Sequence, residues 1–240
     1  MDITQDGAVI TGTINESLNI KANNVTVTNF KLDAQWAPYG INAMFDNGDG
    51  QPYTGLKVFN GEVTNANSAM IYGRNMHLRR LNIHDGGADA IKAETNSLIE
   101  YCFLHHTGKN PESHADGIQA RWGNNIIIRY NRIWYPTKHN EEGYNTNAAI
   151  ILQSATGPVH HCQIYGNFLE GGNYTVFLTN KNPEQYQNPW NMILNGNSFG
   201  RDYRYGLLRA DIGENWQIDG NRWYDTQEFV DINTWDGDNQ

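Results

Sequence analysis

Most of the side chains that could carry acid–base chemistry lie in one window of the chain, residues 74–139. This window holds six of the eight histidines and nine of the 17 lysines and arginines, but only six of the 26 acidic residues. The net charge of the whole chain is −9. A basic, histidine-rich segment on an acidic chain favours an anionic substrate. The overall acidity argues against nucleic acid as a partner, because nucleic-acid binding requires a basic face.

The residue types in and near this window suggest three roles. The candidate catalytic side chains, which could move protons or stabilise an anion, are Lys92, Arg121, His84, His106 and His114. The candidate substrate contacts are Gln119, Trp122, Lys109 on the loop 107–114, and His139 and Tyr144 on the loop 136–147. The candidate metal ligands are Asp85, Asp89 and Asp116. Carboxylate oxygens suit calcium, and paired carboxylates also serve as the acid and base of glycoside hydrolysis.

Repeated strands must position these groups. An apolar pattern recurs at residues 25–30, 76–81 and 126–133, with looser copies later, and a second short apolar segment follows each copy, as at 90–93, 117–120 and 149–152. The period is about 20–35 residues. A strand, a turn, a second strand and a loop, repeated about eight times, predict a single domain, 1–240, folded as a right-handed parallel β-helix. A β-propeller is the alternative, but its blades need four strands in ~40–45 residues.

The chain contains 32 asparagines. Asparagine tolerates the left-handed backbone region at a corner of such a coil. It can also donate a hydrogen bond to the equivalent asparagine of the next coil. The composition therefore supports a solenoid whose corners are lined with asparagine.

Residues one period apart become neighbours when the coils stack about 4.8 Å apart. Aligning Ile91 with Ile118 brings three pairs together, namely Asp89 with Asp116, Lys92 with Gln119, and Glu94 with Arg121. Aligning Leu81 with Phe103 places His84 beside His106. Because side chains alternate along a strand, we expect Lys92, Glu94, Gln119 and Arg121 to point outward on one face.

The same alternation predicts the core. The side chains expected inside are Val25, Val27, Leu81, Ile83, Ile91, Ile118, Ile126, Ile128, Ile150, Val176, Leu207 and Val230. Cys102 and Cys162 are expected to be reduced and buried, since two cysteines are too few for a disulfide scaffold.

The segments 91–94 and 121–125, with the corner at Phe103 between them, resemble polysaccharide lyase family six, the alginate lyases and chondroitinase B, within the pectin-lyase-like superfamily. The resemblance implies that Lys92 is the base, that Arg121 assists proton return, and that calcium is a cofactor. Two residues depart from the family pattern, because Ala93 replaces a serine and Trp122 replaces a histidine. The segment 114–119 also resembles phage tailspike-type β-helices.

Three functions stay open. A lyase would cleave a uronate-containing polysaccharide by β-elimination, with Lys92 and Arg121 in the roles just named. A glycoside hydrolase would use Asp89 and Asp116 as acid and base. A non-catalytic module would bind a glycan on its aromatic and amide side chains, to which seven Trp and 13 Tyr could contribute.

The sequence also sets expectations for partners and location. We expect an anionic polysaccharide as the partner and an extracellular or virion-associated location. The given chain shows no signal peptide and no apolar run long enough to cross a membrane. The solenoid ends must be capped, by the tail 216–240, by a second copy or by a larger parent protein, because a bare end exposes strand edges.

Overall fold

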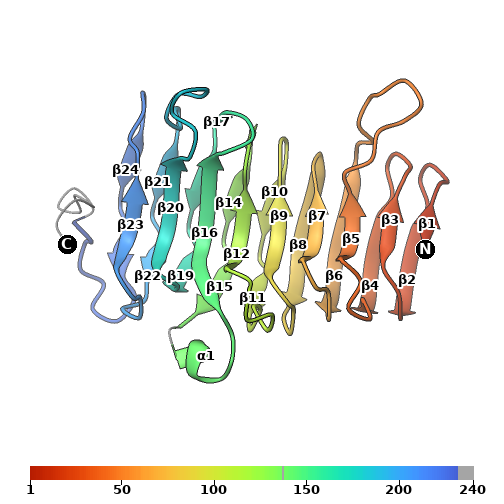
Figure 1. Ribbon diagram of the computed structural model, residues 1–240, viewed down its shortest axis with the longest axis horizontal. Helices are drawn as coiled ribbons and strands as arrows, with labels where there is room; N and C mark the ends of the chain where they lie inside the picture. Colours follow the sequence, from red (N-terminus) through yellow and green to blue (C-terminus); the bar gives the residue numbers. More distant parts are fainter. Residues whose placement is uncertain (137, 232–240) are drawn as a thin grey trace.

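The computed structural model describes residues 1–136 and 138–231, which form a parallel β-helix (Figure 1). The nine strands of one sheet, here called sheet A, are β1 (Asp2–Ile3), β3 (Leu18–Ile20), β5 (Tyr39–Ala43), β7 (Ala69–Gly73), β9 (Asp89–Ala93), β12 (Ala115–Ala120), β16 (Thr146–Ser154), β20 (Tyr174–Asn180) and β23 (Gly206–Ala210). Each strand pairs in parallel with the next in this order. The predicted fold is confirmed, with one more strand in this sheet than the eight coils expected.

A second sheet of 14 strands, here called sheet B, completes the coils. Its four long or unbroken strands are β2 (Val9–Ile14), β4 (Thr26–Asp33), β6 (Leu56–Thr64) and β8 (Met76–Ile83). In later coils the equivalent strand divides into two, giving β10 (Leu98–Glu100) and β11 (Phe103–His105), β14 (Ile127–Arg129) and β15 (Arg132–Tyr135), β18 (Gln163–Tyr165) and β19 (Phe168–Gly171), β21 (Ile193–Asn195) and β22 (Ser198–Phe199), and β24 (Gln217–Asp219) and β25 (Arg222–Trp223). A further two-stranded sheet pairs β13 (Gly123–Asn124) with β17 (Val159–His160).

The division occurs at a corner where one residue per coil has a positive φ. The residues at this corner, in coil order, are Asn29, Asn60, Arg80, Tyr101, Tyr130, Gly166, Gly196 and Gly220. Asparagine and glycine accept this conformation at low cost. Further asparagines with positive φ, including Asn75, Asn96 and Asn125, form the corner between sheets A and B. The corner role expected for asparagine is thereby confirmed.

A ladder of buried asparagines lies just inside the divided strands. The side-chain amide of Asn131 donates to Asn167 Oδ1, Asn167 donates to Asn197, and Asn197 donates to Asn221, each at 3.0 Å. The same carboxamide oxygens accept the backbone N–H of the preceding ladder residue. The ladder therefore satisfies polar groups that the interior would otherwise leave unpaired.

Eleven of the twelve residues predicted for the core are fully or almost fully buried, and Val230 packs partly buried against them. Cys102 and Cys162 are free and buried, as expected, and burial raises both thiol pKa values to about 12. The segment 229–232 repeats the apolar pattern that predicts a second strand, but its described part, residues 229–231, forms none. There, Phe229 makes an isolated antiparallel bridge to Arg222, and Ile232 lies outside the described residues.

Irregular segments leave the solenoid at two places in Figure 1. The loop 44–55 follows β5, and the segment after β15 contains the short helix α1 (Lys138–Glu141), which hangs below the coils. Within the described residues, no helix has the length and apolar character to span a membrane.

Candidate functional site

Sheet A presents two outward rows that position the predicted groups. The first row runs Tyr72, Lys92, Gln119, Ile151, Phe177 and Arg209 on successive strands. The second row lies two residues further along each strand, beyond Ala93 and Ala120, and begins with Arg74, Glu94 and Arg121. The register predicted from Ile91 and Ile118 is confirmed.

Asp89 and Asp116 form a buried acid pair at the start of β9 and β12. Their exposed fractions are 4% and 1%. The backbone N–H of Asp116 donates to Asp89 Oδ1 at 2.8 Å, while Gln119 and Asn147 donate their side-chain amides to Asp116 at 3.0 and 2.9 Å. Burial raises the pKa of Asp89 to about 6, against the opposing charge of Lys92. Burial and then the charge of Asp89 raise the pKa of Asp116 well above its usual range.

The side chain of Lys92 lies against this pair and does not extend freely into solvent. Its Nζ lies 3.4 Å from Asp89 Oδ2 and donates a hydrogen bond to Ser68 Oγ at 3.1 Å. A base that abstracts a proton must be neutral and unengaged. In this arrangement Lys92 instead compensates the buried carboxylate.

Glu94 and Arg121 are neighbours, as the alignment predicted, but they differ in exposure. Glu94 is 4% exposed, although alternation placed it outside, and its Oε2 has no hydrogen-bond partner among the described residues. Burial raises its pKa to about 8, against N–H donors from Trp122 and Arg121. Arg121 is exposed and forms no ion pair with a described residue.

A hollow of about 390 Å³, here called the sheet A groove, lies beside the acid pair. Its lining side chains are His114, Asp116, Gln119, Ala120, Arg121, Asn147, Ile151, Gln153 and Lys181. The predicted residues His114, Asp116, Gln119 and Arg121 are thus brought together. Lys181, like Arg121, has no carboxylate partner within 4.0 Å in the described chain. The groove therefore offers amide donors and acceptors together with two uncompensated cations.

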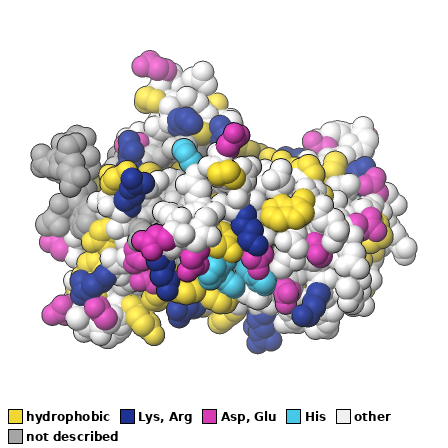
Figure 2. Space-filling view, turned by 60° about the horizontal axis from the view of Figure 1, so that its bottom comes forward, with side chains coloured by type: hydrophobic (Ala, Val, Ile, Leu, Met, Phe, Trp, Pro, Cys, Tyr) yellow, Lys and Arg dark blue, Asp and Glu magenta, His cyan; other side chains and the backbone are white. Residues whose placement is uncertain are grey.

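A second group of predicted residues gathers at the C-terminal ends of β8 and β11 in sheet B. Figure 2 shows histidine side chains grouped on the surface among acidic and basic ones. His84 stacks on His105 with ring centroids 4.9 Å apart, and His105 shares a 2.6 Å hydrogen bond with His106. The prediction that His84 lies beside His106 is wrong by one residue, because Phe103 pairs with Asn82 and not with Leu81. Burial lowers the pKa of His106.

Asp85 belongs to this histidine group and not to the acid pair. It accepts hydrogen bonds from His84 and Lys109 at 2.6 Å and from Tyr144 at 3.4 Å, and the contact with Lys109 holds its pKa down at about 2 despite the opposing effect of burial. No three His, Cys, Asp or Glu side chains converge as metal ligands within residues 1–136 and 138–231. The three predicted ligands Asp85, Asp89 and Asp116 are therefore not brought together.

Trp122 lies between β12 and β13, outside the groove lining. A Cβ added at Gly157 would lie 2.9 Å from the Cβ of Trp122. His139 lies in helix α1.

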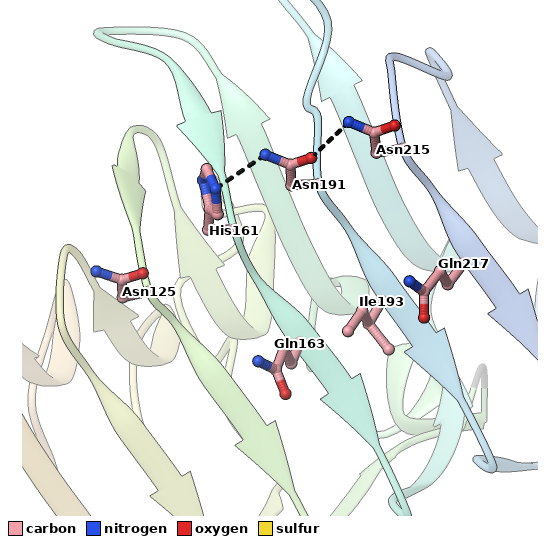
Figure 3. A pocket seen from close by; sticks show the side chains of 7 residues that line it. All are labelled: Asn125, His161, Gln163, Asn191, Ile193, Asn215 and Gln217. Atoms are coloured by element: carbon pink, nitrogen blue, oxygen red, sulfur yellow. Dashed lines mark hydrogen bonds between the residues drawn. The ribbon is translucent and has the colours of Figure 1, made fainter.

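Another hollow, of about 270 Å³, lies over β18, β21 and β24 (Figure 3). Along its edge Asn215 donates to Asn191, and Asn191 bonds to His161 Nε2. Gln163, Ile193 and Gln217 occupy equivalent positions on the three strands. This lining carries no Lys, Arg, Asp or Glu side chain.

Sequence reasoning missed Ser68, Asn147, Gln153 and Lys181. Asn147 and Gln153 belong to β16, one coil after the residues they adjoin, and Lys181 follows β20. They lie outside the window 74–139, within which basic residues and histidines were counted. Extending the coil alignment one period beyond Arg121 would have reached Gln153, which pairs with Thr179 on the next strand.

Comparisons with known proteins identify the fold alone. No protein-family model matches the chain, and no curated protein matches it. Among solved structures, the chain is similar to PfbA, a surface adhesin of Streptococcus pneumoniae, with 12% sequence identity and a TM-score of 0.59. The match covers 87% of this chain and 61% of that chain.

Proposed function

We propose that the chain binds an acidic polysaccharide along the outer face of sheet A. The observation that carries the proposal is the pair Arg121 and Lys181, two cations without ion-pair partners among the described residues, in a hollow whose lining also includes the amide side chains of Gln119, Asn147 and Gln153. Guanidinium groups bind carboxylates through two parallel hydrogen bonds. Amide side chains hydrogen-bond to sugar hydroxyls as donors and acceptors. A uronate-containing chain matches both features.

A binding role outside the cell is part of this proposal. The solved structure to which the fold is similar is a surface adhesin, so this fold serves binding at a bacterial surface in at least one protein. An extracellular or virion-surface location agrees with an acidic glycan as the partner.

β-Elimination is the second candidate, favoured by the position of Lys92 on β9 and of Arg121 directly after the neighbouring strand β12. In a lyase, a bound uronate carboxylate would lie against Arg121 and Lys92 would remove the adjacent proton. Lys92 would first have to leave Asp89, from which it lies 3.4 Å away. A hydrolase would instead use the protonated form of Asp116 as the acid.

One experiment separates the three functions. The chain is incubated with alginate, with polygalacturonate and with neutral dextran, and three signals are followed: retention on immobilised polymer, ultraviolet absorbance of an unsaturated uronate, and new reducing ends. We expect retention on the acidic polymers alone, without cleavage. Absorbance that falls about 10²–10⁴-fold in Lys92→Ala would establish the lyase instead. Reducing ends without absorbance would establish a hydrolase, and equal retention on dextran would refute the anionic ligand.

A further inference from the structure

A second surface with unusual chemistry lies at the corner that divides sheet B. Tyr101, Tyr130 and Tyr224 are 48%, 45% and 57% exposed, and all three line one hollow of about 320 Å³. Monomeric proteins rarely group exposed aromatic side chains without a partner for them. This hollow is lined by none of the residues of the sheet A groove.

The backbone conformation at this corner is energetically unfavourable for tyrosine. Tyr101 and Tyr130 have φ angles of 56° and 57°, in the left-handed region, where a non-glycine residue costs roughly 1–2 kcal/mol. Five of the six other coils place asparagine or glycine there. Burial does not offset the cost, because half of each ring faces solvent. An unfavourable backbone conformation at a largely exposed side chain favours a functional role for these tyrosines.

The rings form a continuous platform. Tyr101 stacks on Tyr130 with centroids 5.3 Å apart and planes 28° apart. Gly166 follows Tyr130 at the same corner, and a Cβ there would lie 2.7 Å from the Tyr130 ring, so glycine leaves room for the ring to spread over the next coil. Phe168 and Tyr224, in edge contact at 4.9 Å, line the same hollow.

Arg132 supplies the charge at this hollow. Its guanidinium lies 4.6 Å from the centroid of the Phe168 ring, and no carboxylate of the described residues lies within 4.0 Å of it. Arg79 and Arg129, which flank the tyrosines, are by contrast paired with Glu100. The hollow thus joins flat aromatic rings to one guanidinium that forms no ion pair with a described residue.

We propose that this corner is a second, independent site for acidic oligosaccharides. The apolar C–H face of a sugar ring stacks on Tyr101 and Tyr130, whose hydroxyls remain able to hydrogen-bond at the ring edge. Arg132 binds the carboxylate of a neighbouring sugar. The tyrosines follow one another along the coil axis, which suits a linear polymer, and the volume lies in the range of small-molecule sites, ~300–1,000 Å³.

The test replaces both tyrosines by the residue that the fold itself uses at this corner. Tyr101→Asn with Tyr130→Asn removes the rings but keeps a side chain that tolerates positive φ, as at Asn29 and Asn60. The control is Tyr205→Asn, which removes a similarly exposed ring elsewhere. Calorimetric titration with tetragalacturonate and with neutral maltotetraose is performed on each variant, in the natural chain and in an Arg121→Ala, Lys181→Ala background.

We expect tetragalacturonate to bind in that background, and its affinity to fall at least tenfold in the double asparagine variant but not in the Tyr205 control. Arg132→Lys is expected to weaken binding as well, because lysine lacks the planar fork. Equal affinity in the double asparagine variant, or no binding once the sheet A groove is disabled, would overturn the second site. If all binding depends on the corner tyrosines and none of it on Arg121 and Lys181, the sheet A groove would instead be refuted as a binding site. A loss of self-association in the double asparagine variant, without any change in sugar binding, would show that the rings contact protein and would refute the proposal.

Discussion

The acid pair shows how burial decides the state of single side chains. Two carboxyl groups in one buried site do not both ionise readily. The side-chain ammonium of Lys92 stabilises Asp89 as an anion, whereas the pKa of Asp116 is raised by burial and by Asp89. The proximity of Asp89, Lys92 and Asp116 was predictable from their spacing in the sequence. Their burial was not, because it depends on Ser68 and Asn147 from other coils.

We expect the pair to make stability depend on pH. A carboxyl group whose pKa is raised in the folded state stabilises the fold below its unfolded pKa, and this contribution is lost as pH rises through the folded value. For Asp89 that window runs from 3.8 to about 6. A shift of that size corresponds to at most about 3 kcal/mol. Thermal unfolding midpoints should therefore fall from pH 4 to pH 7 in the natural chain.

The variant Asp89→Asn with Asp116→Asn should flatten this fall, because neither amide titrates. Glu94→Gln should reduce the slope over the whole interval from about pH 4.5 to pH 8, because the pKa of Glu94 is raised from 4.5 to about 8 in the folded state. Parallel curves for the natural chain and the double variant would show that the pair does not titrate as described.

At the scale of strands and corners, hydropathy predicted sheet A better than sheet B. The alternation around Ile91 and Ile118 fixed the register of β9 and β12 because one face of each strand is strictly apolar. At the divided corner the inward position passes from Leu81 through Cys102 to Asn131. If the inward position is assigned to the more apolar residue, Phe103 is chosen in place of Cys102. The predicted pairing with the preceding coil is then shifted by one residue. A hydropathy pattern cannot predict that an asparagine is buried. The burial is explained by the hydrogen bonds within the asparagine ladder.

Asn167→Ala tests the ladder. It should lower the free energy of unfolding by about 1–3 kcal/mol, because the backbone N–H and the side-chain amide of Asn131 lose their shared acceptor inside the protein. Asn195→Ala is the matched control, since Asn195 is exposed on β21 and its side chain bonds to no described residue. Urea denaturation of both variants measures the difference. Equal losses would mean that the ladder does not stabilise the fold.

At the scale of the whole molecule, a solenoid carries separate surfaces on separate sides. Four of the nine lysines and arginines in residues 74–139 pair with acids of the same window, as Asp85 binds Lys109, Asp89 binds Lys92, and Glu100 binds Arg79 and Arg129. The lysines and arginines without an ion-pair partner among the described residues include Arg121 and Lys181 in the sheet A groove and Arg132 at the tyrosine corner. Net charge over a window of sequence located the region, but only ion pairing between coils shows which charges are available to a ligand.

The central claim is that Arg121 and Lys181 hold an acidic polysaccharide, and its most direct measurement is the affinity for alginate at two salt concentrations. In the natural chain, binding should weaken as salt screens the exposed charges. Arg121→Ala with Lys181→Ala should weaken binding about tenfold or more and reduce the salt dependence, whereas Lys31→Ala with Lys57→Ala, which removes the same charge from exposed positions on sheet B, should change neither. Equal affinities of the two double variants for alginate, with the same dependence on salt, would contradict the account.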